Sequence, residues 1–138
     1  MKKVTGIGGV FFKCRDPKAM KEWYGEHLGL ITDDYGGAFQ WRQYDQPEKS
    51  GYTAWSPFRR DSDYFAPSEK DFMFNYRVAD LDALLAELRK AGISIIGEVQ
   101  VFDYGRFAHI LDPEGNKIEL WEPRDEAFDD YYQGKVNR

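Results

Sequence analysis

Apolar and polar positions are arranged most clearly near the end of the chain, where two short apolar runs flank a turn. The runs cover residues 107–111 and 117–121, and Asp112-Pro113-Glu114-Gly115-Asn116 lies between them. Proline fixes φ at the start of a turn, and Gly and Asn tolerate the positive φ that closes it. The pattern therefore predicts a β-hairpin. If Leu111 pairs with Lys117, His109 lies opposite Glu119 on one face; a slip of one residue would separate them.

Two helices have clear start and stop signals. Asp16-Pro17 combines a capping residue with a proline suited to the first turn, and it predicts a helix to about residue 27 that Gly29 ends. Asp80 caps a second predicted helix, residues 81–90, which Gly92 ends. Its apolar stripe consists of Leu81, Leu84, Leu85 and Leu88.

Short runs with strand character surround both helices. We expect strands at residues 6–14, 31–34, 38–44, 51–55, 71–78, 93–96 with 99–102, and in the two arms of the hairpin. Gly36-Gly37 is interpreted as a turn between strands. Residues 56–70 contain two prolines and mixed charges, so they are interpreted as a crossover linker.

The order of these elements repeats. Strand, capped helix, glycine and three strands occur twice, about 64 residues apart, which is the separation of Asp16 and Asp80. The pattern predicts an α+β fold in which two βαβββ modules, about 4–57 and 71–123, form one curved mixed sheet with a central cleft. Residues 1–123 would be a single domain, and 124–138 a C-terminal extension. That extension would form a short helix packed on the domain or on a partner chain, or a frayed tail.

Composition narrows the choice of partners and compartment. The chain is 42% apolar and 17% aromatic, enough for a packed core, and its net charge of −5 disfavours nucleic acid as a partner. The single cysteine, Cys14, excludes an internal disulfide and is typical of a reducing compartment. No run approaches a signal peptide or the ~20 apolar residues of a membrane span. We therefore expect a cytoplasmic protein with no membrane partner.

His109 and Glu119 are the strongest candidates for chemistry. A carboxylate beside an imidazole in a cleft could bind a ligand or transfer a proton, with the carboxylate raising the pKa of the imidazole. The pair could equally be a hydrogen-bonded structural pair. Arg77 lies at the end of its strand, as Lys13 does in the first module, and could bind an anionic group or remain solvated.

Five further residues would face the cleft if the repeat is correct. They could hold a flat or apolar ligand, although a core or a dimer interface uses the same residue types. They are Phe11, Trp55, Met73, Phe107 and Trp121.

The segments DPKAMKEWYGEHLGL, ADLDALLAELRKAGI and GRFAHILDPEGNKIELWEP together resemble the vicinal oxygen chelate superfamily. This group includes glyoxalase I, bleomycin-resistance proteins, fosfomycin-resistance enzymes and extradiol dioxygenases. The resemblance covers roughly residues 4 to 123, and DPEGNKIEL is its most specific part. It implies paired βαβββ modules with a cleft and assembly as a homodimer.

Metal enzymes of this superfamily draw one ligand from each of four cleft strands. By resemblance, Glu119 matches the ligand of the last strand, whereas the others fall on Gly9, on Met73 and on Thr53 or Trp55. Even with His109 recruited, only two donors remain, and a divalent ion needs three or more from the protein. We therefore expect no metal and no other cofactor.

Two functions follow as hypotheses. The first is a metal-independent protein, similar to the bleomycin-resistance branch, that binds a hydrophobic or aromatic small molecule in the cleft. The alternative is a lyase or transferase of the same superfamily, similar to lactoylglutathione lyase, with Glu119 as general base and His109 as its partner. A module that only dimerises or docks to another protein is a third possibility.

Overall fold

The computed structural model describes residues 2–138. In chain order, its elements are β1 (Val4–Cys14), α1 (Pro17–Leu28), β2 (Thr32–Asp33), β3 (Gly36–Arg42), β4 (Ser50–Arg59), β5 (Phe72–Val78), α2 (Leu81–Lys90), β6 (Ile96–Phe102), β7 (Gly105–Leu111), β8 (Lys117–Pro123) and α3 (Asp125–Tyr132).

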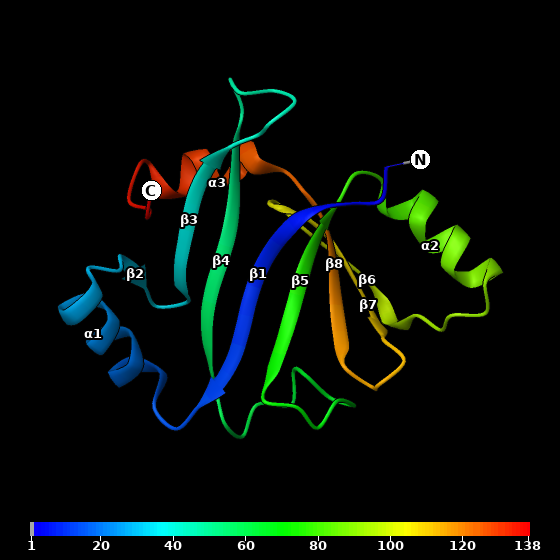
Figure 1. The fold of residues 1–138 in the computed structure, drawn as a ribbon, viewed down its shortest axis with the longest axis horizontal. Coiled ribbons are helices and arrows are strands. Elements are labelled where there is room, and N and C mark those ends of the chain that lie inside the picture. Colours follow the sequence, from blue (N-terminus) through cyan, green and yellow to red (C-terminus); the bar gives the residue numbers. More distant parts are fainter. Residues whose placement is uncertain (1) are drawn as a thin grey trace.

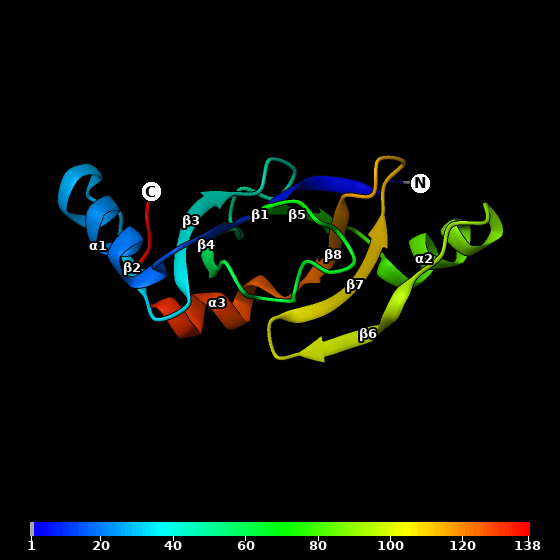
Figure 2. The ribbon, with the colours of Figure 1, turned by 90° about the horizontal axis from the view of Figure 1, so that it is seen from below.

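The eight strands form one mixed sheet in the order β2-β3-β4-β1-β5-β8-β7-β6 (Figure 1). Strands β1 to β4 come from the first module and β5 to β8 from the second. The modules join where β1 pairs with β5 in antiparallel fashion, and β1–β4 and β5–β8 are parallel pairs. The sheet curves strongly when seen from below (Figure 2). The predicted α+β fold of two βαβββ modules is confirmed.

Helices α1 and α2 lie on the convex side of the sheet and begin as predicted. The side chain of Asp16 accepts a hydrogen bond from the amide of Ala19, and that of Asp80 accepts one from Ala83. Gly29 ends α1 with φ of 70°. Helix α2 covers β5, β8 and β7 with a buried apolar cluster: Val78, Leu81, Leu84, Leu85, Ala108, Ile110 and Leu120.

Several predicted boundaries shifted, and two of the shifts concern β3 and β4. Gly36-Gly37 is not a turn but the start of β3, because these residues pair with Asp33 and Thr32. Strand β4 runs past Trp55 to Arg59. Its pairing with β3 ends at Trp55, so Pro57, which lacks an N–H, lies where the strand has β1 as its only neighbour.

The C-terminal extension folds as a helix on the concave side of the sheet (Figure 2). Phe128 and Tyr132 of α3 contact the ring of Tyr52 at centroid distances of 5.4 and 5.8 Å. Beyond the helix, the main chain of Asn137 exchanges hydrogen bonds with β3. Of the alternatives for this segment, the helix packed on the domain is the one observed.

Within residues 2–138, no helix is both long enough and apolar enough to cross a lipid bilayer.

Candidate functional site

His109 and Glu119 meet as the hairpin register predicted. Strands β7 and β8 pair Leu111 with Lys117 and His109 with Glu119. The Nε2 atom of His109 lies 2.8 Å from Oε2 of Glu119, and both side chains are buried. The predicted pair is confirmed as a contact.

The carboxylate of Glu119 has two further donors. The hydroxyl of Tyr64 donates to Oε2 at 2.5 Å, and the amide nitrogen of Asn75 donates to Oε1 at 2.7 Å. Three side chains from three different segments therefore hold one buried carboxylate. This arrangement fixes its orientation and stabilises its charge.

Tyr64 is held firmly in this position, although it comes from the linker between the modules. Its ring stacks on Phe58 at 5.7 Å, and Nζ of Lys117 donates to its carbonyl oxygen at 2.7 Å. Burial, together with the negative charge of Glu119, raises the pKa of Tyr64 far above its ordinary value. The phenol therefore remains protonated and continues to donate to Glu119. Burial also lowers the pKa of Lys117.

The site lies on a row of paired residues that crosses the centre of the sheet. Successive pairings join Ala54 to Gly9, Gly9 to Asn75, Asn75 to Glu119 and Glu119 to His109. A register shift between Ile7 and Gly9 marks a bulge in β1.

The bulge brings the backbone of β1 so close to Asn75 that only a glycine fits at position 8. A Cβ on Gly8 would lie 2.1 Å from Oδ1 of Asn75 and 2.9 Å from the ring of Trp121. Within the described part of the chain, Oδ1 of Asn75 is a buried acceptor without a hydrogen-bond partner. Gly8 thus lets the backbone of β1 approach the Asn75 amide closely.

These residues do not fit a divalent metal ion. We expected the row to include Met73 and either Thr53 or Trp55; the structure places Asn75 and Ala54 there instead, beside Gly9. The only carboxylate and imidazole in the row already bond to each other. Over residues 2–138, no three His, Cys, Asp or Glu side chains come together as a possible ion site. The donor set is too small for Zn²⁺ or Fe²⁺.

A large cleft of about 1820 Å³ lies on the concave side of the sheet, with Glu119 and Asn75 in its wall. Phe107 and Trp121 stack in parallel at 5.7 Å and form part of this wall. Strands β1 and β4, the linker, the turn between β6 and β7, and α3 supply the remainder of the apolar lining. The aromatic side chains at this end of the cleft are Phe11, Phe58, Tyr64, Tyr104, Phe107, Trp121 and Phe128.

Three residues that we expected to contact a ligand lie elsewhere. Trp55 faces the convex side, where it contacts Tyr24 of α1 at 4.7 Å, because the alternation along β4 turns Ala54 and Ser56 toward the cleft. Met73 is fully buried and is not part of the cleft wall. His109 is buried beside Glu119 and is not part of the cleft wall.

Arg77 is buried in an ion pair and is not a free anion-binding group. Its guanidinium donates two hydrogen bonds to Asp125, at 2.8 and 2.6 Å, and lies between the rings of Trp41 and Trp121. It occupies the level of Gly6, where β1 no longer pairs with β4. Arg77 therefore fills the gap between these strands and anchors α3.

Sequence reasoning missed Tyr64, Asn75 and the contribution of α3. Tyr64 and Phe65 are adjacent aromatic residues in a linker rich in charged side chains, and Asn75 is a polar side chain between two aromatic ones, Phe74 and Tyr76. Each of these departures from the local pattern could have indicated a residue of the site. Nothing in the sequence indicates that Phe128 turns into the cleft.

Comparisons with known proteins agree with this fold. The family model described as glyoxalase/bleomycin resistance protein/dioxygenase superfamily matches residues 6–120. A search of curated proteins found no match. Methylmalonyl-CoA epimerase from Mycobacterium tuberculosis is a similar solved structure, with 23% identity, a TM-score of 0.59 and coverage of 91% of this chain and 92% of that one.

Two other solved structures show the same architecture. Methylmalonyl-CoA epimerase from Streptomyces coelicolor, in complex with 2-nitronate-propionyl-CoA, is 18% identical with a TM-score of 0.62, over 86% of this chain and 97% of that one. Catechol 2,3-dioxygenase is 20% identical with a TM-score of 0.61, over 90% of this chain and 41% of that one. At these identities the structures show the fold, whereas the family model covers most of the sequence. The chain belongs to the glyoxalase/bleomycin resistance protein/dioxygenase superfamily.

Proposed function

We propose that this protein binds a small organic molecule with an aromatic or apolar body in the cleft, without a metal ion. The observation that carries the proposal is the cleft itself: aromatic side chains line it and it ends on a buried, hydrogen-bonded carboxylate. Ligand pockets of proteins combine an apolar lining with a few fixed polar groups in this way. The cleft, with a volume of about 1820 Å³, is larger than one small ligand would fill.

The polar end of the cleft favours a ligand that donates hydrogen bonds. Tyr64 directs its proton to Glu119, so its oxygen is left to accept. An amine or hydroxyl group would complement this oxygen, whereas a carboxylate would face Glu119. The net charge of −5 also favours neutral or cationic ligands over anions.

Binding is the better-supported function because Glu119 already accepts three hydrogen bonds. A general base must accept a proton from the substrate, and here that proton would compete with Tyr64, His109 and Asn75. The alternative remains a lyase or transferase with Glu119 as base and His109 as its partner. The contact of 2.8 Å between these two side chains in a cleft supports it.

Tryptophan fluorescence tests the binding proposal directly, because Trp121 lines the cleft. We would titrate the protein with matched aromatic amines, phenols and carboxylates. Saturable changes with the amines or phenols, and weaker binding of the carboxylates, are expected. Phe107→Ala should weaken binding at least tenfold, since it removes the ring stacked on Trp121. Val101→Ala, on an exposed strand position, is the control. No response across the panel would contradict the proposal.

Glu119→Gln separates the two functions. This change keeps the shape of the side chain but removes its charge. If the protein is an enzyme that acts on a small carbonyl, epoxide or thiol conjugate, turnover should be lost while folding is kept. If it only binds, no turnover should be detected with either protein, and the variant should change affinity alone.

Two further properties belong to this proposal. The resemblance supports a homodimer, and the lone Cys14 supports a cytoplasmic location. The small-molecule ligand is the proposed partner in place of nucleic acid or a membrane.

A further inference from the structure

The rings that line the aromatic end of the cleft form two groups. One group, which we call the α3 wall, comes from β7, β8, α3 and the turn between β6 and β7. Its four rings contact one another in a closed cycle: Tyr104, Phe107, Trp121 and Phe128. The other group, the linker wall, comes from β1, β4 and the linker. Its rings are Phe11, Phe58 and Tyr64.

The two walls meet the sheet on either side of Glu119. Within residues 2–138, no ring of the α3 wall contacts a ring of the linker wall. Tyr64 of the linker wall donates to the carboxylate of Glu119. Trp121 of the α3 wall follows Glu119 by two positions on β8, so its side chain leaves the sheet on the same face. A flat ring in the cleft can therefore lie between the walls and beside the carboxylate.

The ring of Tyr104 is held firmly in the α3 wall. It stacks on Phe102 and on Phe128, with centroids 5.3 Å apart in both pairs. Its carbonyl oxygen accepts hydrogen bonds from Nε1 of Trp121 at 2.9 Å and from the amide of Arg124 at 3.0 Å. Figure 2 shows how the turn between β6 and β7, which carries Tyr104, reaches back toward α3. These contacts fix the position of the ring before any ligand arrives.

The hydroxyl of Tyr104 differs from that of Tyr64 in one respect. Tyr64 donates its proton to Glu119, whereas within residues 2–138 the hydroxyl of Tyr104 has no hydrogen-bond partner. Both hydroxyls lie near the same carboxylate, because burial and then the negative charge of Glu119 raise the pKa of both tyrosines. Both therefore stay protonated at neutral pH, and the proton of Tyr104 is the one free to be donated.

We propose that Tyr104 donates a hydrogen bond to the bound molecule, so that the cleft selects flat aromatic ligands that carry both a donor and a neutral acceptor. A hydroxyaryl ketone or amide is the simplest member of this class. Its ring would lie between the two walls, its hydroxyl on the oxygen of Tyr64 and its carbonyl on Tyr104. The inference rests on the proposed function and adds a specificity-determining residue to it.

The charge of Glu119 decides which acceptor fits. A carboxylate would accept from Tyr104 equally well, but it would place a second negative charge beside Glu119. A ketone or amide oxygen accepts the same bond without that cost. A ligand that lacks any acceptor would cover the hydroxyl of Tyr104 and leave it unpaired, which is unfavourable in a partly dry cleft.

Calorimetric titration with two matched pairs of compounds tests the proposal. The pairs are 3-hydroxyacetophenone with 3-ethylphenol and 4-hydroxyacetophenone with 4-ethylphenol, which differ only in the carbonyl oxygen. In at least one pair, Tyr104→Phe should lower the affinity for the ketone relative to its ethyl partner by about fivefold, the size of one hydrogen bond. Comparing the ratio within each pair removes the difference in hydrophobicity between the compounds.

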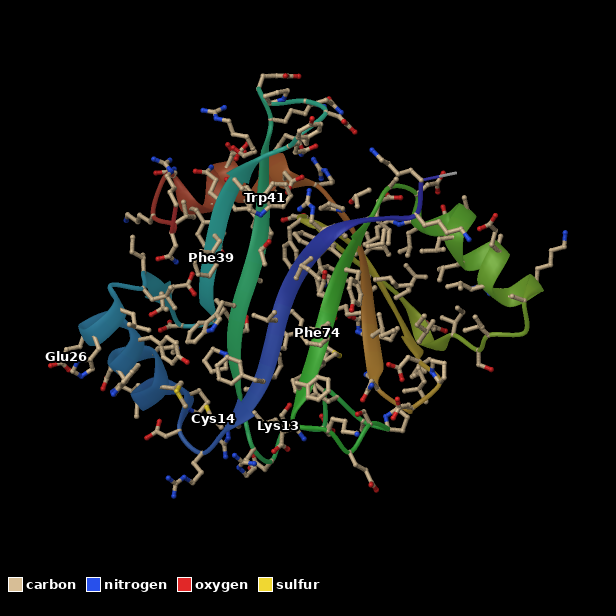
Figure 3. The ribbon with its side chains drawn as sticks, viewed as in Figure 1. Lys13, Cys14, Glu26, Phe39, Trp41 and Phe74 are labelled. Atoms are coloured by element: carbon tan, nitrogen blue, oxygen red, sulfur yellow. The ribbon has the colours of Figure 1, made fainter. Side chains whose placement is uncertain are left out.

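Two control variants should leave both ratios as in wild type. Tyr44→Phe removes a hydroxyl at a position that is 96% exposed in the loop between β3 and β4. Phe74→Ser removes an exposed ring from the convex face, where Figure 3 shows Phe39 and Phe74. This second control detects phenols that bind to exposed rings outside the cleft. Circular dichroism and thermal unfolding establish that each variant is folded.

Infrared spectroscopy of the wild-type complex gives a second measurement that needs no variant. The carbonyl band of the bound ketone should lie at the lower wavenumber of a hydrogen-bonded ketone. Ratios that Tyr104→Phe leaves unchanged in both pairs, or a carbonyl band at the position of a free ketone, would overturn the role of Tyr104 while the binding function stands. If none of the four phenols binds to wild type, the binding function itself is contradicted and this inference falls with it.

Discussion

Gly8 is the residue whose small size the site depends on most directly. Any Cβ at this position would lie 2.1 Å from Oδ1 of Asn75, well inside van der Waals contact. Glycine at this position therefore lets β1 lie directly against the Asn75 amide, which donates to Glu119. The absence of a side chain at Gly8, in the first module, thus allows the Asn75 amide of the second module to reach Glu119.

We predict that Gly8→Ala destabilises the protein by about 1–3 kcal/mol and displaces Asn75 from Glu119. The free energy of unfolding in urea measures the first effect, and binding of an aromatic amine measures the second. Gly25→Ala is the control, since Gly25 lies in α1 and its added Cβ would meet only Leu30 O at 3.4 Å. Equal stabilities of the two variants would contradict this account.

Two tyrosines, Tyr52 packed against α3 and Tyr132 at its end, predict a loss of stability in alkali. Burial, then a hydrogen bond to Asp129, raises the pKa of Tyr52 to about 12, and burial raises that of Tyr132 to about 12. Because the folded state holds these protons more tightly, their stabilisation is complete below pH 10. It is lost as the pH rises from about 10 toward 12.

The expected loss is on the order of 2 kcal/mol for Tyr52 across that range. Thermal unfolding between about pH 9 and pH 11.5 should show it. Tyr52→Phe keeps the ring and should flatten this pH dependence, whereas Tyr44→Phe, at an exposed position, should leave it unchanged. A wild-type melting temperature that stays constant across this range would refute the assignment.

At the scale of the element, α3 is fixed to the sheet by two polar contacts, one of them buried, as well as by its rings. Asp125 in its first turn neutralises Arg77, and Asp129 one turn later accepts from Tyr52. Helix α3 supplies one wall of the cleft, so these contacts also set the width of the ligand site.

Asp125→Ala should cost about 3–5 kcal/mol, because it leaves the buried guanidinium of Arg77 without a counter-ion. Glu126→Ala, the next residue of the same turn, is exposed and should change stability by less than about 0.5 kcal/mol. Urea unfolding of both variants gives the comparison. A similar small effect for both would mean that the ion pair does not hold α3 in place.

The sequence predicts elements well where local chemistry decides them. Asp16, Asp80 and Gly29 act only on neighbouring residues, and the 112–116 turn sets the register that joins His109 to Glu119. The expectation that Trp55 faces the cleft was wrong because the strand pattern alone does not decide which of two alternating sets of residues faces inward, and β4 turns Ala54 and Ser56 to the cleft. Tyr64 was missed because a linker has no periodic pattern, and its position depends on Lys117 and Phe58, far away in sequence or on another element.

At the scale of the whole molecule, the donor set predicts how the protein responds to metal ions. Treatment with EDTA should leave both the melting temperature and ligand affinity unchanged, and added Zn²⁺ or Ni²⁺ should not raise the melting temperature. Elemental analysis of the purified protein provides an independent measurement. A stoichiometric divalent ion, lost together with stability on chelation, would show that the site recruits donors that its present geometry does not bring together.

The row of paired residues across the centre of the sheet shows that the two halves of this chain contribute differently to the site. Asn75 and Glu119 in the second half correspond to Gly9 and Ala54 in the first, so the polar side chains of this row all come from the second half. A bound molecule would accordingly sit off-centre, anchored by the later half and accommodated by the earlier one. Larger side chains in place of Ala54, which lines the cleft, would then change which molecules fit without disturbing the polar anchor.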